Sequence, residues 1–227
     1  MKREIFKTSD GSHSIRLPEW NEQYHSKHGA IQEAEHVFIK SGLVCALQHQ
    51  NSRSLLDVLE MGFGTGLNAL LTVIFSQQNK LPINYTTLEA YPVPEQEWRQ
   101  LNFPQEISEK NTQELFNKLH QSSWEQEITI TPNFILKKQK MFFQNFHQKN
   151  KMDVIYFDAF GPRVQPELWE EGMFKTMYEA LRVNGVLVTY SAKGSVRRAL
   201  QQVGFQVDKI PGPPGKREML RAFKKEL

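Results

Sequence analysis

The sequence contains a single cysteine, Cys45, among its 227 residues. An internal disulfide is therefore excluded, and a reducing cytoplasm is the expected compartment. Long apolar runs are also missing, since none approaches the roughly 18 residues that a membrane-spanning helix requires. The first residues, MKREIFKTSDGSH, contain no apolar segment of the kind found in secretory signals. We therefore expect a cytoplasmic protein with no membrane association.

A large excess of charge of one sign and metal-binding motifs are lacking as well. Lysine and arginine total 28 against 25 aspartates and glutamates, which gives a formal net charge of +3. This excess is compatible with an anionic partner such as RNA but does not identify one. His25 and His28 are three positions apart, yet neither a cysteine pair nor an H-E-x-x-H motif accompanies them, so no metal site is expected.

From Ser54 onward, the sequence alternates between strand-like and helix-like segments. The runs LLDVLEM (55–61) and DVIYF (153–157) are almost continuously apolar, as strands buried on both faces are. This alternation predicts a mostly parallel, doubly wound α/β sheet. FQVDKI (205–210) and EMLRAF (218–223) are expected to form an antiparallel pair at the end of the sheet.

Three glycines, Gly62, Gly64 and Gly66, follow the first of these strands and precede a predicted helix over 67–76. Glycine lets the backbone turn sharply and approach a ligand closely. The N-terminus of a helix offers unpaired N–H groups to anionic or polar ligands. In an open α/β sheet, ligands bind at the carboxyl ends of the strands. The motif therefore predicts a nucleoside-cofactor site, although a tight turn without a ligand gives the same pattern.

Two cofactors fit this motif. GTGLNA (64–69) matches the dinucleotide fingerprint G-x-G-x-x-A. The longer pattern E-x-G-x-G-x-G, which starts at Glu60, is typical of S-adenosylmethionine-dependent methyltransferases, where the acid can meet the cofactor ammonium. Glu89 ends the next predicted strand, and a carboxylate there can accept hydrogen bonds from ribose hydroxyls of either cofactor.

Asp158 ends the buried strand in DVIYFDAFGP and is expected at the same sheet edge as the glycine loop. Amino methyltransferases commonly carry an acidic or amide side chain near a proline and an aromatic residue at this position. A carboxylate there can orient an amine and accept its proton, which leaves the nitrogen lone pair free to attack a methyl group. The alternative is that Asp158 only caps a helix over about 166–181.

Beyond these motifs, the sequence resembles the MnmC/MnmD family of tRNA wobble-uridine aminomethyl methyltransferases over nearly its whole length. The most diagnostic matches are FDAFGPRVQPELWEEGMF (157–174), NGVLVTYSAKGSVRRALQQVGF (184–205) and GKREML (215–220). Further matches are YHSKHGAIQEAEHVFI (24–39), EMGFGTGLN (60–68) and LEAYP (88–92).

The resemblance implies a Rossmann-like methyltransferase fold with a mostly parallel seven-stranded sheet. Residues 51–227 would form the methyltransferase domain, and residues 1–50 an N-terminal extension on or over the cofactor site. The extension is expected to contain a strand near 14–16 and a helix from about 31 to 47. Because the chain ends at Leu227 without a second glycine fingerprint, it is interpreted as the stand-alone form, without a fused oxidase domain.

The resemblance also implies the reaction and its site. S-adenosyl-L-methionine would methylate the 5-aminomethyl group of (2-thio)uridine in the anticodon stem-loop of tRNA, with Asp158 near the amine. A separate oxidase or another enzyme would supply the aminomethyl group. The expected cofactor-binding residues are Glu60, Gly62, Gly64, Gly66, Asn68, Glu89, Gln139 and Asp158.

Gln139 is included because the segment ILKKQKMFF (135–143) lacks the acid that relatives place near the adenine. Either Gln139 or backbone groups would then recognise the adenine. The expected substrate-binding residues are Tyr24, Phe160, Lys193, Arg197, Arg198, Lys216 and Arg217, of which the basic ones would contact tRNA phosphates.

Three other functions stay open at this point. GTGLNA could serve a nicotinamide-dependent oxidoreductase, although no hydride-acceptor residues are evident. A methyltransferase or aminopropyltransferase-like enzyme acting on a small amine would use similar strands and a similar aspartate. A non-catalytic RNA-binding module would not explain why Glu60, the glycines, Glu89 and Asp158 are all intact.

Overall fold

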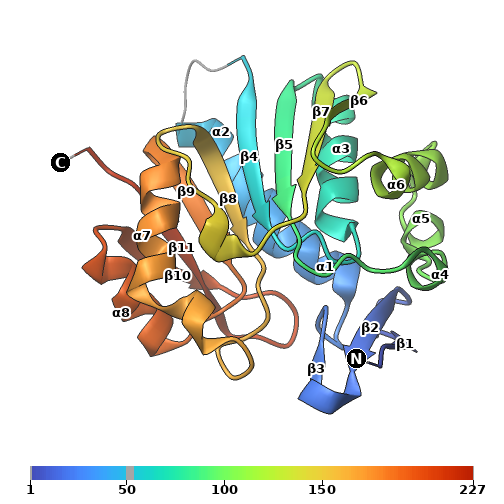
Figure 1. Cartoon of the computed structure of the whole chain (residues 1–227), viewed down its shortest axis with the longest axis horizontal. Coiled ribbons are helices and arrows are strands. Elements are labelled where there is room, and N and C mark those ends of the chain that lie inside the picture. The colour runs from blue at the N-terminus through green and yellow to red at the C-terminus, as the bar shows by residue number, and fades with distance from the viewer. Residues whose placement is uncertain (1, 50–53, 227) are drawn as a thin grey trace.

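The computed structural model describes residues 2–49 and 54–226. It forms an α/β fold in which helices cover both faces of a central sheet, with a small N-terminal sheet beside its lower edge in Figure 1. The predicted boundary between residues 50 and 51 lies outside the described residues.

The central sheet has eight strands in the order β10-β11-β9-β8-β4-β5-β7-β6. Strands β4, β5, β7, β8 and β9 are parallel, whereas β11 runs antiparallel to β9 and β6 antiparallel to β7. The predicted class, a mostly parallel α/β sheet, is confirmed. The strands span Leu56–Met61 (β4), Ile83–Leu88 (β5), Glu127–Thr131 (β6), Phe134–Gln139 (β7), Met152–Phe157 (β8), Leu181–Thr189 (β9), Gln206–Pro211 (β10) and Glu218–Phe223 (β11).

The expected count of seven strands is one too few for the described chain. The segment ITITPNFILKKQ contains two strands, because Pro132 and Asn133 form a turn between β6 and β7. β6 then pairs antiparallel with β7 and becomes the edge strand. The terminal β10–β11 pair is antiparallel as predicted, with Asp208 opposite Arg221.

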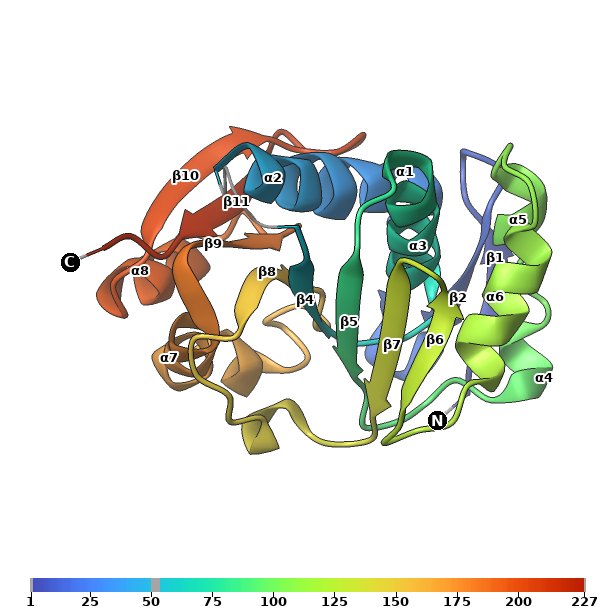
Figure 2. The ribbon, with the colours of Figure 1, turned by 90° about the horizontal axis from the view of Figure 1, so that it is seen from above.

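Burial explains the apolar strands. Every residue of β8 is buried, and so is every residue of β4 except Asp57, because both strands lie between two helical layers. Figure 2 shows the long N-terminal helix and α3 (Leu67–Asn79) on one side of the sheet and α7 (Glu171–Ala180) on the other.

The other helices of the main domain are α4 (Glu95–Trp98), α5 (Phe103–Glu106), α6 (Thr112–Gln121) and α8 (Gly194–Gln202). Short 3-10 turns are η1 (Pro18–Trp20), η3 (Phe143–Asn145) and η4 (Pro166–Trp169).

The N-terminal segment begins with a three-stranded sheet, β1 (Glu4–Lys7), β2 (His13–Leu17) and β3 (Glu22–Gln23). It continues into one helix that runs from Ala30 to His49 through α1 (Ala30–Ala34), a π-helical middle η2 (Glu35–Val44) and α2 (Cys45–His49). The predicted strand and helix of this segment are therefore both present. The helix packs on α3 and the sheet, so the segment shares the core of the main domain.

Asp10 joins the N-terminal sheet to this helix. Its Oδ2 accepts hydrogen bonds from the backbone N–H groups of Ile31 and Gln32, at 3.0 and 3.2 Å, in the first turn of α1. Asp10 therefore caps a helix that starts twenty residues further along the chain. Gly29 precedes the helix with φ +148°, and a Cβ built there would lie 2.7 Å from the same Asp10 oxygen. The turn thus requires glycine.

Candidate active site

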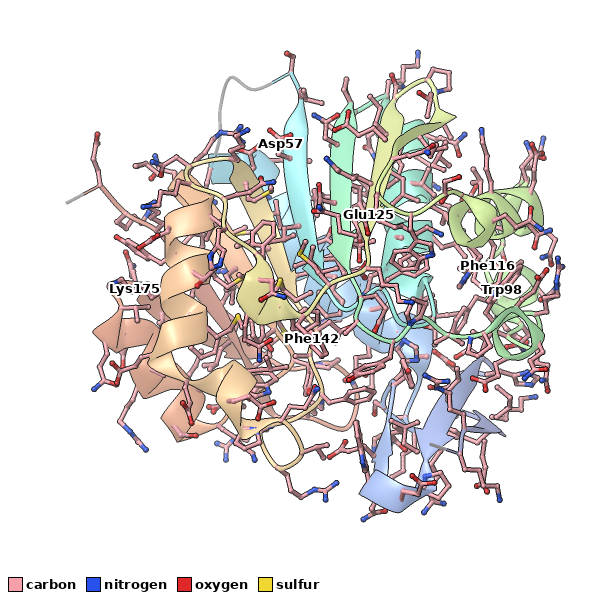
Figure 3. All side chains as sticks on the ribbon, in the orientation of Figure 1. Asp57, Trp98, Phe116, Glu125, Phe142 and Lys175 are labelled. Carbon is pink, nitrogen blue, oxygen red and sulfur yellow. The ribbon has the colours of Figure 1, made fainter. Side chains whose placement is uncertain are left out.

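A cavity of about 570 Å³ opens at the carboxyl ends of β4, β5 and β8. The glycine loop, the ends of β5 and β8, and the N-terminal segment all contribute to its walls. Figure 3 labels Asp57 near the amino ends of the strands and Phe142 beyond their carboxyl ends, at the side of the cavity. The volume of the cavity is in the range of sites that bind small ligands and cofactors.

The glycine loop has a backbone that only glycine adopts easily. Gly62, Gly64 and Gly66 have φ values of +104°, +49° and +74°. A Cβ at Gly64 would lie 3.1 Å from the ring of Tyr24, and a Cβ at Gly66 would lie 2.8 Å from Nε2 of His120. The loop is therefore packed closely on both sides and has no room for side chains at these two positions.

Two histidines, the buried His25 and the half-buried His120, hold Thr65 at the centre of this loop. His25 Nε2 hydrogen-bonds to the Thr65 hydroxyl at 3.2 Å, and His120 Nε2 donates to the Thr65 carbonyl at 3.1 Å. His120 also stacks on Trp98, with ring centroids 4.4 Å apart. Burial lowers the pKa of His25 to about 4 and that of His120 to about 3, so both rings are neutral at pH 7. They act as fixed supports of the loop.

Glu89 lies beside the loop, directly after β5. Its Oε2 accepts the backbone N–H of Gly64 at 3.0 Å, and its Oε1 accepts the backbone N–H of Tyr91 at 2.9 Å. Burial raises the pKa of Glu89, and these two hydrogen bonds oppose that rise. Each carboxylate oxygen has a further lone pair, so Glu89 can also accept hydroxyl groups from a ligand in the cavity.

Asp158 faces the cavity at the end of β8. Asn68, in the first turn of α3, donates from Nδ2 to Asp158 Oδ2 at 2.8 Å. Burial raises the pKa of Asp158 to about 7, while the Asn68 hydrogen bond and the charge of Lys216 act in the opposite direction. Near neutral pH this carboxyl group can therefore both lose and accept a proton.

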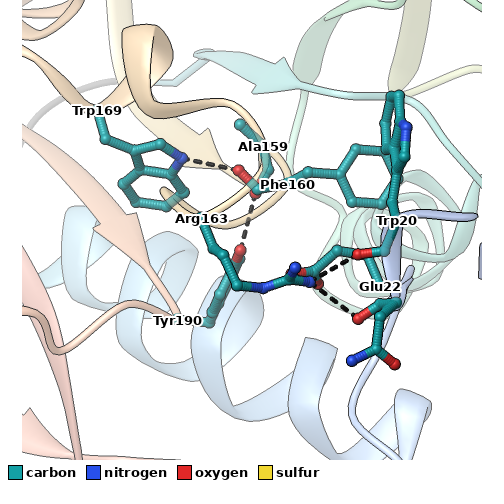
Figure 4. Close-up of polar contacts among 8 residues, drawn as sticks. Trp20, Glu22, Ala159, Phe160, Arg163, Trp169 and Tyr190 are labelled. Carbon is teal, nitrogen blue, oxygen red and sulfur yellow. Dashed lines mark hydrogen bonds and ion pairs between the residues drawn. The ribbon is translucent and has the colours of Figure 1, made fainter.

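The loop after Asp158 is fixed from two sides (Figure 4). Trp169 Nε1 donates to the Phe160 carbonyl at 2.7 Å, and the Tyr190 hydroxyl donates to the Ala159 carbonyl at 2.9 Å. Arg163 Nη2 donates to the Trp20 carbonyl at 2.8 Å and forms an ion pair with Glu22 at 2.7 Å. The loop is thus tied to both the main domain and the N-terminal segment.

Aromatic rings form much of the cavity wall near Asp158. Phe160 contacts Tyr24 and Trp20 edge-to-face, with centroids 5.1 and 5.9 Å apart. On another part of the wall, Tyr91 and Phe142 meet at 5.8 Å and are both more than half exposed. Such faces can stack on flat heterocycles.

The structure brings eight of the predicted site residues to the cavity wall. They are Tyr24, Gly62, Gly64, Asn68, Glu89, Asp158, Phe160 and Lys216.

Three predicted cofactor residues lie behind the wall. Glu60 is completely buried under the glycine loop, and Gly66 forms the start of α3. Gln139 ends β7, where its carbonyl accepts the Glu89 N–H, and residues 142–144 line the cavity instead. Among the predicted tRNA-contacting residues, four are not part of the wall: Lys193, Arg197, Arg198 and Arg217.

Several residues of the cavity wall are not among the predicted site residues. Arg3 and Glu33 come from the N-terminal segment, and Tyr190 from the end of β9. Glu33 accepts Lys216 Nζ at 2.8 Å, and Lys216 lies over the Tyr190 ring at 4.2 Å. For Tyr190, the end of a predicted parallel strand is the one signal that could have been used.

Within residues 2–49 and 54–226, no cluster of three or more His, Cys, Asp or Glu side chains is arranged to hold a metal ion. A helix with the length and apolar character needed to cross a membrane is likewise not found in the described part of the chain.

Comparison with protein families gives a match over residues 104–225 to the model described as S-adenosyl-L-methionine-dependent methyltransferase. The chain is 32% identical over 216 residues to the tRNA 5-methylaminomethyl-2-thiouridine biosynthesis bifunctional protein MnmC of Paracidovorax citrulli, a match that covers 90% of this chain and 33% of the relative. The protein of the same name from Leptospira interrogans is 27% identical, with coverages of 89% and 32%. The chain thus spans about a third of the length of these relatives.

Among solved structures, MnmC2 from Aquifex aeolicus superposes with a TM-score of 0.77 at 24% identity, over 100% of this chain and 72% of that one. Spermidine synthase from Thermotoga maritima gives a TM-score of 0.56 at 16% identity, over 98% and 68% of the two chains. At these identities the likeness supports the fold alone.

Proposed function

Since the chain belongs to the family of S-adenosyl-L-methionine-dependent methyltransferases, we propose that it methylates the 5-aminomethyl group of (2-thio)uridine at the wobble position of tRNA. The product would be 5-methylaminomethyl-(2-thio)uridine. The family match decides between the two cofactors that the glycine motif allowed, in favour of S-adenosyl-L-methionine. The choice of substrate follows the names of the relatives, which cover more than this chain.

The observation that carries the proposal is the position and pKa of Asp158. It faces the cavity that the glycine loop lines, and its pKa of about 7 suits a group that accepts a proton near neutral pH. An amine attacks only through a free lone pair. A carboxylate that accepts an N–H hydrogen bond orients the amine and takes up the proton that the nitrogen loses.

The residues of the cavity fit the cofactor. Gly62 and Gly64 line the cavity with backbone that carries no side chain, and a Cβ on them would lie 3.2 Å from the Asp158 carbonyl oxygen and 3.1 Å from the Tyr24 ring. Glu89 retains lone pairs for ribose hydroxyls. When bound, S-adenosyl-L-methionine supplies a methyl group on a positively charged sulfur, so that a new N–C bond forms as the S–C bond breaks.

The aromatic wall would serve the uracil ring. Phe160, Tyr24 and Trp20 offer ring faces and edges beside Asp158 and limit the access of water to the reacting amine. Lys193, Arg198 and Arg217 are exposed, and we infer that they contact phosphates of the anticodon stem-loop. Binding would then weaken as salt concentration rises. We also infer that the enzyme acts in the cytoplasm on an aminomethyl group made by a separate oxidase or another enzyme.

The test is incubation with methyl-labelled S-adenosyl-L-methionine and tRNA from cells that lack this gene, followed by nucleoside analysis. Label in 5-methylaminomethyl-(2-thio)uridine, formed at least about 10²-fold more slowly when Asp158→Asn replaces the native protein, is the expected result. Label only in a free small amine would replace the tRNA proposal with the small-amine alternative. Transfer from a decarboxylated cofactor, but not from S-adenosyl-L-methionine, would indicate an aminopropyltransferase.

A further inference from the structure

Glu60 lies under the cavity and not in its wall. It is paired in register with Thr87 of β5 and Tyr156 of β8, so all three side chains point to the same face of the sheet. The Glu60 side chain has no exposed surface. Its Oε2 accepts the Thr87 hydroxyl at 2.7 Å. In this position Glu60 is separated from the space that a cofactor would occupy.

Three buried oxygens in this region have no hydrogen-bond partner among the described residues. They are Oε1 of Glu60, the hydroxyl of Tyr85, and Oδ1 of Asn68, whose Nδ2 donates to Asp158. Unpaired buried polar atoms are costly, and native proteins rarely retain them. When Glu60 is ionised, its Oε1 and Asn68 Oδ1 are both acceptors, and the one hydroxyl of Tyr85 can donate to only one of them. A proton on Glu60 would supply the second donor, so that Glu60 donates to Asn68 Oδ1 while Tyr85 donates to Glu60.

The charges around Glu60 also favour its neutral form. The titratable groups that face it are Tyr85 of β5, Tyr156 of β8 and Asp158 at the end of β8, and none of them is a cation. None of the ion pairs among residues 2–49 and 54–226 includes Glu60. Burial raises its pKa well above the usual range, and the nearby Asp158 raises it further. Two carboxyl groups in one dry region do not both ionise readily.

Of these two groups, Asp158 is the better placed to carry the charge. It faces the cavity, it accepts a hydrogen bond from Asn68, and the charge of Lys216 acts on it. The two hydroxyls that face Glu60, those of Thr87 and Tyr85, pair equally well with a neutral acid.

We propose that Glu60 is a protonated positioning residue whose O–H donates to Asn68 Oδ1, so that Asn68 in turn holds Asp158 Oδ2 and leaves Oδ1 of Asp158 directed to the substrate amine. This inference rests on the proposed function for the role of Asp158. It differs from the expectation that Glu60 binds the cofactor ammonium as an anion. Glu60 acts here through Asn68 and touches neither cofactor nor substrate.

The test compares Glu60→Gln with Glu60→Leu. Glutamine keeps an acceptor for Thr87 and a donor for Asn68, whereas leucine removes both. We expect Glu60→Gln to keep cofactor affinity, measured by calorimetry, and kcat within about 3-fold of the native protein. Glu60→Leu should also keep affinity within a few-fold, but its kcat should fall by about 10- to 100-fold, the rate equivalent of one charge-assisted hydrogen bond. A loss of cofactor affinity greater than about 10-fold in Glu60→Gln would overturn the proposal, because only an anionic partner of the ammonium predicts it.

Two measurements need no tRNA and no turnover. The infrared spectrum of the native protein minus that of Glu60→Gln should contain the carbonyl stretch of a protonated carboxyl group at pH 7.5, and a carboxylate band instead would contradict the proposal. The pKa of Asp158, followed by carbon NMR, should be unchanged in Glu60→Gln. If methyl transfer to tRNA fails while both results hold, the proposed function is wrong and the neutral state of Glu60 stands. Because Glu60→Leu can fail to fold, the infrared comparison alone decides the protonation state.

Discussion

Asp158 combines a cavity-facing carboxyl group with a pKa of about 7, which makes its protonation the first quantity to vary. The carboxylate is the form that accepts a proton, so kcat/KM should rise with pH through about 7. Asp158→Asn should lower methyl transfer by about 10²–10⁴ and leave cofactor affinity within a few-fold. It should also remove the step near pH 7, while the dependence that comes from the substrate amine remains. Steady-state rates from pH 5.5 to 9 for both proteins measure this.

The same substitution separates a catalytic from a structural role. The folded pKa of Asp158 is raised above the roughly 3.9 of an unfolded chain. Between these values the folded state binds more protons, so stability that this group contributes is lost as pH rises from about 4 through 7. Asp158→Asn should therefore be more stable than the native protein at pH 8, by up to roughly 4 kcal/mol for a pKa raised from about 3.9 to about 7, and equal to it near pH 4. Lower stability of the variant in urea at pH 8 would mean that the carboxylate supports the fold, for example as a helix cap.

The sequence predicts those site residues that belong to a local motif. It does not predict residues that reach the site only because distant elements pack together. Gly62, Gly64, Glu89 and Asp158 stand at the ends of predicted strands, and parallel strands bring such ends together. His120 has no such signal, because its contact with Thr65 spans 55 positions and depends on how α6 packs. The protonation state of Glu60 cannot be predicted from the sequence either, because it depends on burial and on neighbours from other strands.

Among the elements of the site, the glycine loop has the backbone conformation that tolerates substitution least. Gly64→Ala would place a Cβ at φ +49° and 3.1 Å from the Tyr24 ring. The expected result is a loss of about 1–2 kcal/mol in unfolding free energy and a cofactor affinity reduced at least about 10-fold. Gly172→Ala is the matched control, because Gly172 lies in α7 and a Cβ there would meet no other part of the described structure within 4 Å. Alanine there should stabilise the helix by about 0.5–1 kcal/mol.

Unfolding in urea and calorimetric titration with cofactor measure both effects. If Gly64→Ala binds the cofactor as the native protein does, then the loop does not need close backbone approach, and its glycines serve only the turn.

Strands are predictable from the sequence where both of their faces are buried. Strands buried on both faces are almost wholly apolar, which made β4 and β8 predictable. The sequence does not show that β6 and β7 are two strands. Isoleucine and threonine alternate without a break up to Pro132, and the pairing of β6 with the sheet edge is a tertiary contact. The capping of α1 by Asp10 was also missed, since helix caps are normally sought next to the helix in sequence.

The N-terminal segment joins the main domain both at the cavity and in the core of the molecule. It supplies Tyr24, Glu33 and Arg3 to the cavity wall, and its helix shares the core with α3. Its small sheet is joined to that helix by the Asp10 carboxylate, which also accepts hydrogen bonds from Ser12 and Thr8. Asp10 therefore controls how firmly the wall that contains Tyr24 is held beside the glycine loop.

Asp10→Ala should lower the unfolding free energy by about 1–2 kcal/mol at pH 7 and weaken cofactor binding. Burial alone would raise the pKa of Asp10, but the hydrogen bonds from Ser12, Thr8 and Gln32 outweigh it, and the folded pKa is lowered. The stabilisation is therefore present above the unfolded pKa of about 3.9 and is lost as pH falls through the folded value. The difference between variant and native protein should shrink below about pH 4.

Asp208→Ala is the control, because the Asp208 side chain is 38% exposed and its ion pair with Arg221 of the β10–β11 pair is long, at 3.8 Å. Its stability should change by less than about 0.5 kcal/mol, and its cofactor affinity should not change. Equal losses of stability and affinity in Asp10→Ala would indicate that the segment and the main domain bind the cofactor as one unit. Lower stability with native affinity would instead mean that residues 2–49 cover the core without contributing to the site, and the proposed role of Tyr24 would have to be withdrawn.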